Sequence, residues 1–279
     1  MTFYSLFSQS RLATSGLLVL LLLSLNSLAA GTTGTLPQAT AVIRASGFHS
    51  LISQLPSHFE AGLEHGAALA GQPQQQAQLQ TLARRSLENS DVPQQMAEAV
   101  SKALTAEELL AILRWYQSDT GRKINQAQMY AASEQGFAEM MGQANQVLTS
   151  PELLQLAELL DKQLGLVEFM VDMQEHQQLA KYSTLSGLNG EPFALPEFRQ
   201  QMQQQRKHMV FNAEQLVSMS LGFALRDFSA AELQAYEHFL QQPVTQLYLK
   251  AAMHGLAQAR QQMVQHWLQG LSTLQPAAE

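Results

Sequence analysis

Cysteine is absent from this 279-residue sequence, and that absence excludes several kinds of chemistry. Without a thiol the chain forms no disulfide, holds no cysteine-ligated zinc and uses no cysteine nucleophile. It also lacks the residue to which a lipoprotein-type anchor is attached. Burial of apolar side chains must therefore stabilise the fold, and hydrophobic residues make up 46% of the chain.

Charge is scarce as well, since charged residues account for only 14% of the sequence. The 23 acidic residues outnumber the 16 Lys and Arg residues, which gives a net charge of −7. Nucleic-acid binding depends on Lys and Arg neutralising phosphates, so this balance predicts no nucleic-acid partner. It equally argues against a polybasic face that binds a membrane surface.

Motifs of known catalytic or cofactor sites are missing too. The sequence has no G-x-S-x-G nucleophile elbow, no G-x-G-x-x-G loop and no Walker pattern. We therefore predict no cofactor and no catalytic residue, although an enzyme with an unfamiliar site remains open.

The N-terminus has the pattern of a secretory signal peptide. Arg11 precedes an apolar run at Leu17–Leu23, and the small residues Ser27 and Ala29 then suit a cleavage site. The run is shorter than the ~20 apolar residues of a spanning helix. We predict a signal peptide over residues 1–29, with cleavage after Ala29 or, alternatively, Gly31. The predicted location is periplasmic or secreted, with no membrane span after cleavage.

From Leu36 onward the sequence predicts helices almost throughout. Leu, Ala, Gln, Glu and Met dominate, and no long alternation of β-branched residues occurs. Gly, Pro and capping residues interrupt the pattern at regular intervals. The expected fold is all-α, with about twelve helices.

Two segments recur in the same order in the two halves of the chain. Residues 104–109 (LTAEEL) align with residues 228–233 (FSAAEL) at an offset of 124. Residues 37–47 similarly resemble residues 151–165. We therefore predict two tandem related helical domains, over 37–147 and 149–272, and a disordered tail over 273–279.

The first of these recurring segments, Leu104–Lys123, has a clear internal logic. Thr105 with Glu108 forms a capping box, and Ser229 with Glu232 repeats it in the second half. Leu109, Ile112, Leu113 and Tyr116 then follow the spacing of one buried helix face, repeated in part by Leu233, Tyr236 and Leu240. Ser118 or Asp119 is expected to cap the next helix, where Gly121 lets another backbone approach closely.

This segment resembles a bacterial secreted family known only as domain of unknown function 2059. The resemblance rests on the pattern E-L-x₅-aromatic-Tyr-x-Ser-x-x-Gly-x-Lys, which is complete in the first copy and degenerate in the second. It implies an all-helical body behind a signal peptide, and it implies no activity. The residues that only the first copy keeps are candidates for a special role, together with the aromatic pair beside them. The candidate binding residues are thus Trp115, Tyr116, Ser118, Gly121 and Lys123, with core packing as the alternative for the aromatic pair.

Another candidate is a metal site at Met170, Met173 and His176, spaced at i, i+3 and i+6 on one predicted helix. Thioethers with imidazole suit Cu(I), and such a site would require one ion per chain that Met173→Leu removes. The alternative is that the methionines fill the core, as methionine at helical spacing commonly does.

Taken together, these features favour binding over catalysis. We predict a binding or interaction module of the cell envelope, with an envelope protein as its partner. A carrier of a lipid-like apolar ligand is the first alternative, because helical bundles rich in Leu, Met and Phe can enclose a cavity. An uncharacterised envelope enzyme is the second. The oligomeric state stays open.

Overall fold

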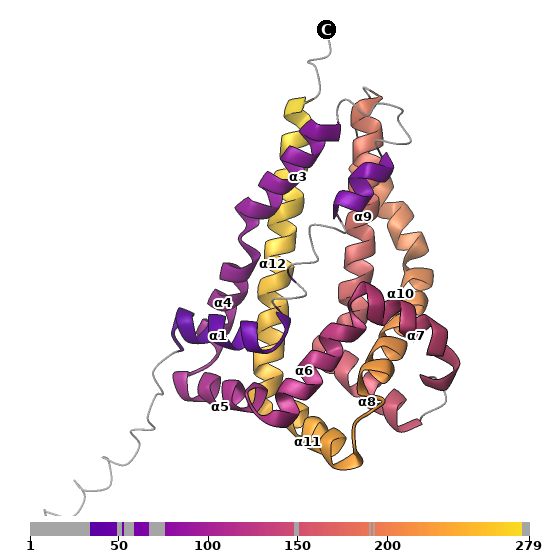
Figure 1. The fold of residues 1–279 in the computed structure, drawn as a ribbon. Helices are drawn as coiled ribbons and strands as arrows, with labels where there is room; N and C mark the ends of the chain where they lie inside the picture. Colours follow the sequence, from indigo (N-terminus) through magenta and orange to yellow (C-terminus); the bar gives the residue numbers. More distant parts are fainter. Residues whose placement is uncertain are drawn as a thin grey trace, which may run out of the picture. The chain divides into compact units, whose positions relative to one another are not determined.

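A computed structural model describes residues 34–48, 52, 59–66, 76–147, 151–189, 191 and 193–274. The predicted signal peptide lies outside the described residues, as do residues 275–279 of the predicted tail. Within the described part every element is helical, which confirms the all-α prediction (Figure 1). The helices are α1 (Leu36–Ala45), α3 (Gln76–Ser90), α4 (Val92–Ala103), α5 (Ala106–Tyr116), α6 (Asp119–Ala131), α7 (Glu134–Val147), α8 (Pro151–Leu164), α9 (Leu166–Leu188), α10 (Leu195–Leu225), α11 (Ala230–Gln241) and α12 (Pro243–Leu274). Residues 59–66 are also helical.

Among these described helices, none combines the length and the apolar character that crossing a bilayer requires.

Helices from both halves of the sequence share one hydrophobic core. The longest helix, α12, packs along α3 and α4, whereas α10 packs against α6, α7, α8 and α9 (Figure 1). The largest cluster of buried residues draws on both sets, and Thr33–Glu279 forms one compact unit. The division into two tandem related domains stays a prediction. If it holds, the two copies are interlocked rather than separate.

Helices of the two predicted copies pair in a reciprocal way, which the predicted repeat would explain. At the offset of 124 residues, α4 corresponds to the end of α10, and α6 corresponds to the start of α12. The observed pairs are α4 with α12 and α10 with α6. In each copy, the helix that precedes the capped helix therefore packs on the other copy's helix that follows the capped helix. Trp115 and Phe239, which occupy equivalent positions, stack on each other at 3.8 Å with an interplanar angle of 3°.

Both predicted capping boxes are confirmed. The Thr105 amide donates to Glu108 Oε2 at 2.8 Å, and the Ser229 amide donates to Glu232 Oε2 at the same distance. Each hydroxyl in turn accepts from the backbone of its glutamate. A further box at the start of α1, made by Thr35 with glutamine rather than glutamate, was not predicted.

The predicted apolar stripes are also confirmed. Leu109 and Ile112 are buried on α5, and Tyr236 and Leu240 are buried on α11. The remaining members of the two stripes are half-buried and pack on the same core. These two helices therefore contribute matching faces to the centre of the molecule.

Two helix junctions share one tight arrangement of serine and glycine. Between α5 and α6, Ser118 Oγ donates to the Trp115 carbonyl at 2.6 Å and accepts from the Gly121 amide at 3.1 Å. Fifteen residues later, Ser133 makes the same two bonds between Tyr130 and Gly136 at the same distances. At both glycines a Cβ atom would lie far inside contact distance of the aromatic residue's carbonyl oxygen. The close approach predicted at Gly121 is thus confirmed, and the second junction was missed although its spacing is identical.

These junctions make a prediction about glycine substitutions. Gly121→Ala and Gly136→Ala should each lower the free energy of unfolding by about 2 kcal/mol, because a backbone carbonyl must move. Gly142→Ala is the matched control, since Gly142 is an exposed glycine within α7 with nothing near its Cβ position. It should raise stability by about 0.5–1 kcal/mol through helix propensity. Urea unfolding followed by circular dichroism measures the free energy of unfolding of all three variants. An equal change in all three would contradict the close approach at Gly121 and Gly136.

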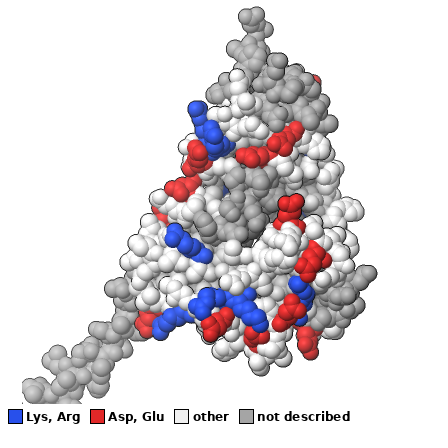
Figure 2. Space-filling view, in the orientation of Figure 1, with Lys and Arg blue, Asp and Glu red and all other residues white. Residues whose placement is uncertain are grey.

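Charged side chains are interspersed rather than gathered into a field of one sign. Figure 2 shows this mixture on one face of the molecule. Several of the charges are paired, as in Arg122 with Asp119 and Arg226 with Glu139. The Arg122–Asp119 pair is largely exposed, and such pairs add little stability.

Candidate functional site

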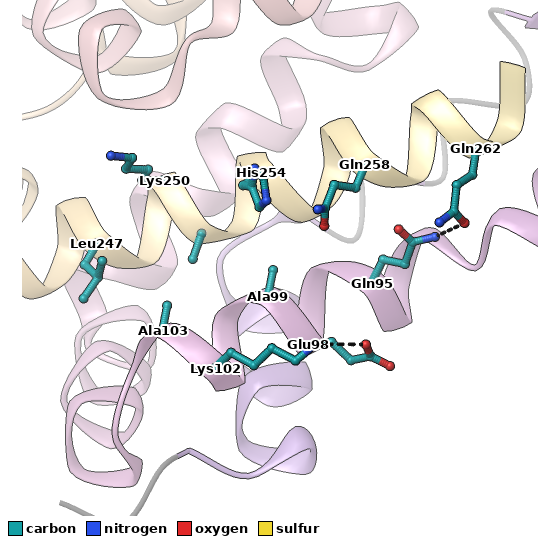
Figure 3. A pocket seen from close by; sticks show the side chains of 11 residues that line it. Gln95, Glu98, Ala99, Lys102, Ala103, Leu247, Lys250, His254, Gln258 and Gln262 are labelled. Atoms are coloured by element: carbon teal, nitrogen blue, oxygen red, sulfur yellow. Dashed lines mark hydrogen bonds and ion pairs between the residues drawn. The ribbon is translucent and has the colours of Figure 1, made fainter. Parts of the chain in front are cut away.

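A groove with a volume of about 610 Å³ runs along the seam between α4 and α12 (Figure 3). The helix α4 supplies one wall and α12 supplies the other. The lining residues are Gln95, Glu98, Ala99, Lys102, Ala103, Leu247, Lys250, Ala251, His254, Gln258 and Gln262.

The two walls approach closely because small residues face each other across the seam. A Cβ atom on Gly255 would lie 2.6 Å from Met96 Cα and 2.8 Å from the Gln95 carbonyl oxygen, so only glycine fits there. The alanines Ala99, Ala103 and Ala251 leave the space above the contact open. Because the two backbones lie so close, the bottom of the groove is shallow, and the longer polar side chains of α4 and α12 form its walls.

The α12 wall carries a regular polar row. Lys250, His254, Gln258 and Gln262 follow one another at steps of four residues, which places them on one helix face. Figure 3 shows Gln262 meeting Gln95 across the seam, with Gln258, His254 and Lys250 farther along α12. The first three side chains are exposed and have no hydrogen-bond partner among the described residues. They are available to a ligand.

The polar residues of the α4 wall are already engaged. Glu98 accepts a hydrogen bond from Gln94 Nε2 at 3.0 Å and lies 3.6 Å from the Lys102 ammonium. The Gln94 bond, followed by the Lys102 charge, lowers the pKa of the Glu98 carboxyl below its usual value. Gln95 Nε2 donates across the groove to Gln262 at 2.7 Å. This wall therefore presents an ionised carboxylate and a bridging amide.

A smaller cavity of about 320 Å³ continues the groove toward the C-terminal end of α12. Glutamines alone line it: Gln95, Gln258, Gln261, Gln262 and Gln265. The whole seam is thus rich in primary amides, each of which can donate and accept. Its basic residues lie at the opposite end.

The predicted binding residues lie elsewhere, where α5, α6 and α11 meet. Trp115 stacks between the rings of Phe239 and Tyr236, at 3.8 and 5.4 Å, and meets Tyr116 edge-on. Burial raises the pKa of the Tyr116 phenol well above its usual value. These contacts favour the core-packing alternative for the aromatic pair.

The other three predicted residues also make contacts within the protein. Ser118 and Gly121 form the tight junction described above. The Lys123 ammonium donates to Glu232 at 2.7 Å and lies 4.5 Å from the centroid of the Phe228 ring. Hydrogen bonds from Lys123 and then Ser229 lower the pKa of Glu232 to about 2. Trp115, Tyr116 and Lys123 thus contact residues of the second predicted copy, whereas Ser118 and Gly121 bond within the first. The binding role of all five stays a prediction.

The three residues of the proposed copper site lie on α9. Met170 and Met173 are half-buried and pack on the main core, as the filler alternative expects. The Nδ1 atom of His176 is buried without a hydrogen-bond partner in the described part of the chain. No cluster of three or more His, Asp or Glu residues suited to a metal occurs among the described residues. The copper site itself stays a prediction.

A buried ionic cluster beside His176 was not predicted. Arg260 of α12 is only 6% exposed, and its Nη2 donates to Asp172 of α9. Its guanidinium lies 5.3 Å from the centroid of the Phe169 ring, and its Nε and Nη1 find no partner in the described structure. Burial, and then the Arg260 charge, lower the pKa of His176 to about 4, so its imidazole is neutral at pH 7. Arg260 lies 88 positions from Asp172 on another helix, so no local spacing in the sequence indicates this cluster.

Comparison with known proteins identifies one family. Residues 90–150 match the model of a family described as an uncharacterized protein conserved in bacteria (DUF2059). No curated protein and no solved structure matches the chain. The match includes Leu104–Lys123 and confirms the resemblance seen in the sequence. It includes α4, one wall of the groove, and ends before α12.

Proposed function

We propose that this chain, which carries the core segment of that uncharacterized bacterial family, is a non-catalytic binding module of the cell envelope. The α4–α12 groove is its binding surface. One observation carries the proposal: Lys250, His254 and Gln258 stand exposed along one groove wall without a hydrogen-bond partner among the described residues. The signal-peptide pattern of residues 1–29 supports the envelope location.

The groove chemistry supports binding more than catalysis. Glu98 is held ionised by its neighbours, which makes it a weak proton acceptor and a good hydrogen-bond acceptor. The amides of the seam are neutral over the whole physiological pH range and orient ligands without reacting. The buried histidine and arginine lie between α9 and α12, away from the groove residues. The groove can therefore recognise a polar ligand by charge and hydrogen bonding.

A tryptophan placed in the groove tests this proposal. Gln258→Trp fills the centre of the seam, whereas Gln204→Trp adds the same side chain at an exposed position of α10. The tagged full chain, isolated gently from the periplasm, is examined by native mass spectrometry. Wild type and Gln204→Trp should carry the same partner at one copy per chain, and Gln258→Trp should retain at least tenfold less.

Three results would contradict the proposal. If Gln258→Trp retained as much partner as the wild type, the groove would not be the binding surface. A retained lipid-sized adduct on the wild type would favour the apolar carrier. Turnover of an envelope substrate by the purified chain would make it an enzyme.

A further inference from the structure

The groove has the length and the polarity of a site for an extended chain. Its lining on α12 runs from Leu247 to Gln265. At about 1.5 Å per residue, this stretch is roughly 27 Å long. An extended peptide rises about 3.3 Å per residue, so roughly eight residues would span it.

The glutamine amides match the hydrogen-bonding pattern of a peptide backbone. Each amide offers a carbonyl acceptor and two N–H donors, and an extended backbone presents donors and acceptors along its length. Three of the groove's glutamines, Gln258, Gln262 and Gln265, lie at steps of three or four residues along α12. Seven of the eleven residues that line the larger part of the groove are polar or charged, so hydrogen-bonding groups occur along its whole length.

One end of the groove is basic although the whole chain is acidic. Lys102, Lys250 and His254 lie there with Glu98 as the one acidic lining residue, whereas the chain carries a net charge of −7. Lys102 pairs loosely with Glu98 at 3.6 Å, and Lys250 has no charged partner in the described structure. Leu247, which is 42% exposed, adds an apolar contact beside them. An acidic ligand is attracted to this end alone, which fixes its direction in the groove.

We propose that the α4–α12 groove binds an extended peptide segment of about eight residues, with an acidic group seated beside Lys250 and His254. The inference rests on the proposed function and names its ligand class. A peptide is favoured over an acidic oligosaccharide because no Phe, Tyr or Trp ring lines the described groove on which the C–H face of a sugar could stack. The backbone occupies the glutamine seam, and the acidic end meets the unpaired ammonium of Lys250.

Selection from a displayed library of random octapeptides on the immobilised full chain tests this inference. The enriched peptides should carry Asp or Glu toward one end. Individual peptides are then measured by fluorescence anisotropy against wild type and three variants. Affinity should fall at least tenfold in Gln258→Trp and about fivefold in Lys250→Gln, and it should weaken in 0.5 M salt because an ion pair is screened. Lys207→Gln, an exposed lysine of α10, should bind as the wild type does.

The outcomes separate this inference from the proposed function. A library without acidic enrichment, or peptides that bind Lys250→Gln as tightly as the wild type, would overturn the peptide inference. An array of acidic oligosaccharides, probed with wild type and Gln258→Trp, tests the alternative ligand class. Groove-dependent binding to that array with no selected peptide would overturn the peptide class while leaving the proposed function in place. Selected peptides that ignore Gln258→Trp would overturn both.

Discussion

Replacing Asp172 with alanine should lower the free energy of unfolding by about 3 kcal/mol, the largest effect we expect from a single substitution. The reason is Arg260, which is 6% exposed and has Asp172 as its ionic partner. Two of its guanidinium nitrogens already lack a hydrogen-bond partner in the described structure. Losing the carboxylate would leave a buried positive charge without compensation. Because the Asp172 side chain is itself 34% exposed, the loss should fall at the low end of the range for buried pairs.

Matched variants separate the charge effect from packing. Arg260→Met removes the buried charge and leaves Asp172 able to reach water, so it should cost less than Asp172→Ala. The double variant should be more stable than Asp172→Ala alone. Asp119→Ala breaks an Asp–Arg pair that is largely exposed, and it should cost less than about 0.5 kcal/mol. Urea unfolding at pH 7 ranks the four proteins, and a double variant weaker than Asp172→Ala would show that packing dominates.

Local rules explain what the sequence could predict of this fold. A capping box needs only a hydroxyl and a carboxylate three residues apart, so the starts of α5 and α11 were found correctly. The buried stripe on α5 needs only helical periodicity, and Leu109 and Ile112 are buried as expected. Glutamine can close such a box as glutamate does, and the box on Thr35 was not predicted.

Pairing between distant helices could not be predicted in the same way. The row from Lys250 to Gln262 is visible in the sequence as a polar helix face, but nothing local indicates that α4 lies beside it. The close approach depends on Gly255 meeting the backbone at Gln95, residues 160 positions apart. The candidate groove is therefore a property of tertiary packing. The family signature at Leu104–Lys123 lies instead where α5, α6 and α11 meet.

The contacts at that junction could be predicted only in part from the sequence. Trp115 and Phe239 lie at equivalent positions of the two predicted copies, yet their direct stacking at 3.8 Å follows only from the tertiary packing that brings α5 and α11 together. Lys123 then bridges to the capping glutamate Glu232 of the other half. Lys123 and the aromatic pair thus connect the two halves, while Ser118 and Gly121 form the tight α5–α6 junction.

Acidification should destabilise the protein through His176, and this is the second large effect that we expect. Burial lowers the pKa of His176 to about 4 in the folded state, while the unfolded imidazole keeps a value near 6.5. Between these values the unfolded chain binds a proton that the folded chain does not, so stability falls as the pH drops from about 6.5 toward 4. The shift corresponds to about 3 kcal/mol when it is complete. The positive charge of Arg260 strengthens the effect, and Asp172 opposes it.

A histidine exchange isolates this contribution from the carboxylates nearby. Glu175, on the same helix, has a raised pKa because of burial, so its own contribution to stability changes with pH in the opposite direction. Glu175 remains in His176→Gln, so the difference between wild type and variant reports the histidine alone. Between pH 7 and pH 4 the wild type should lose about 3 kcal/mol more than His176→Gln, measured by urea unfolding at each pH. His254→Gln, which changes an exposed histidine of α12, should keep the wild-type pH dependence. Parallel curves for wild type and His176→Gln would mean that the imidazole reaches water in the folded protein, so that the α9–α12 interface opens more readily than its packing indicates.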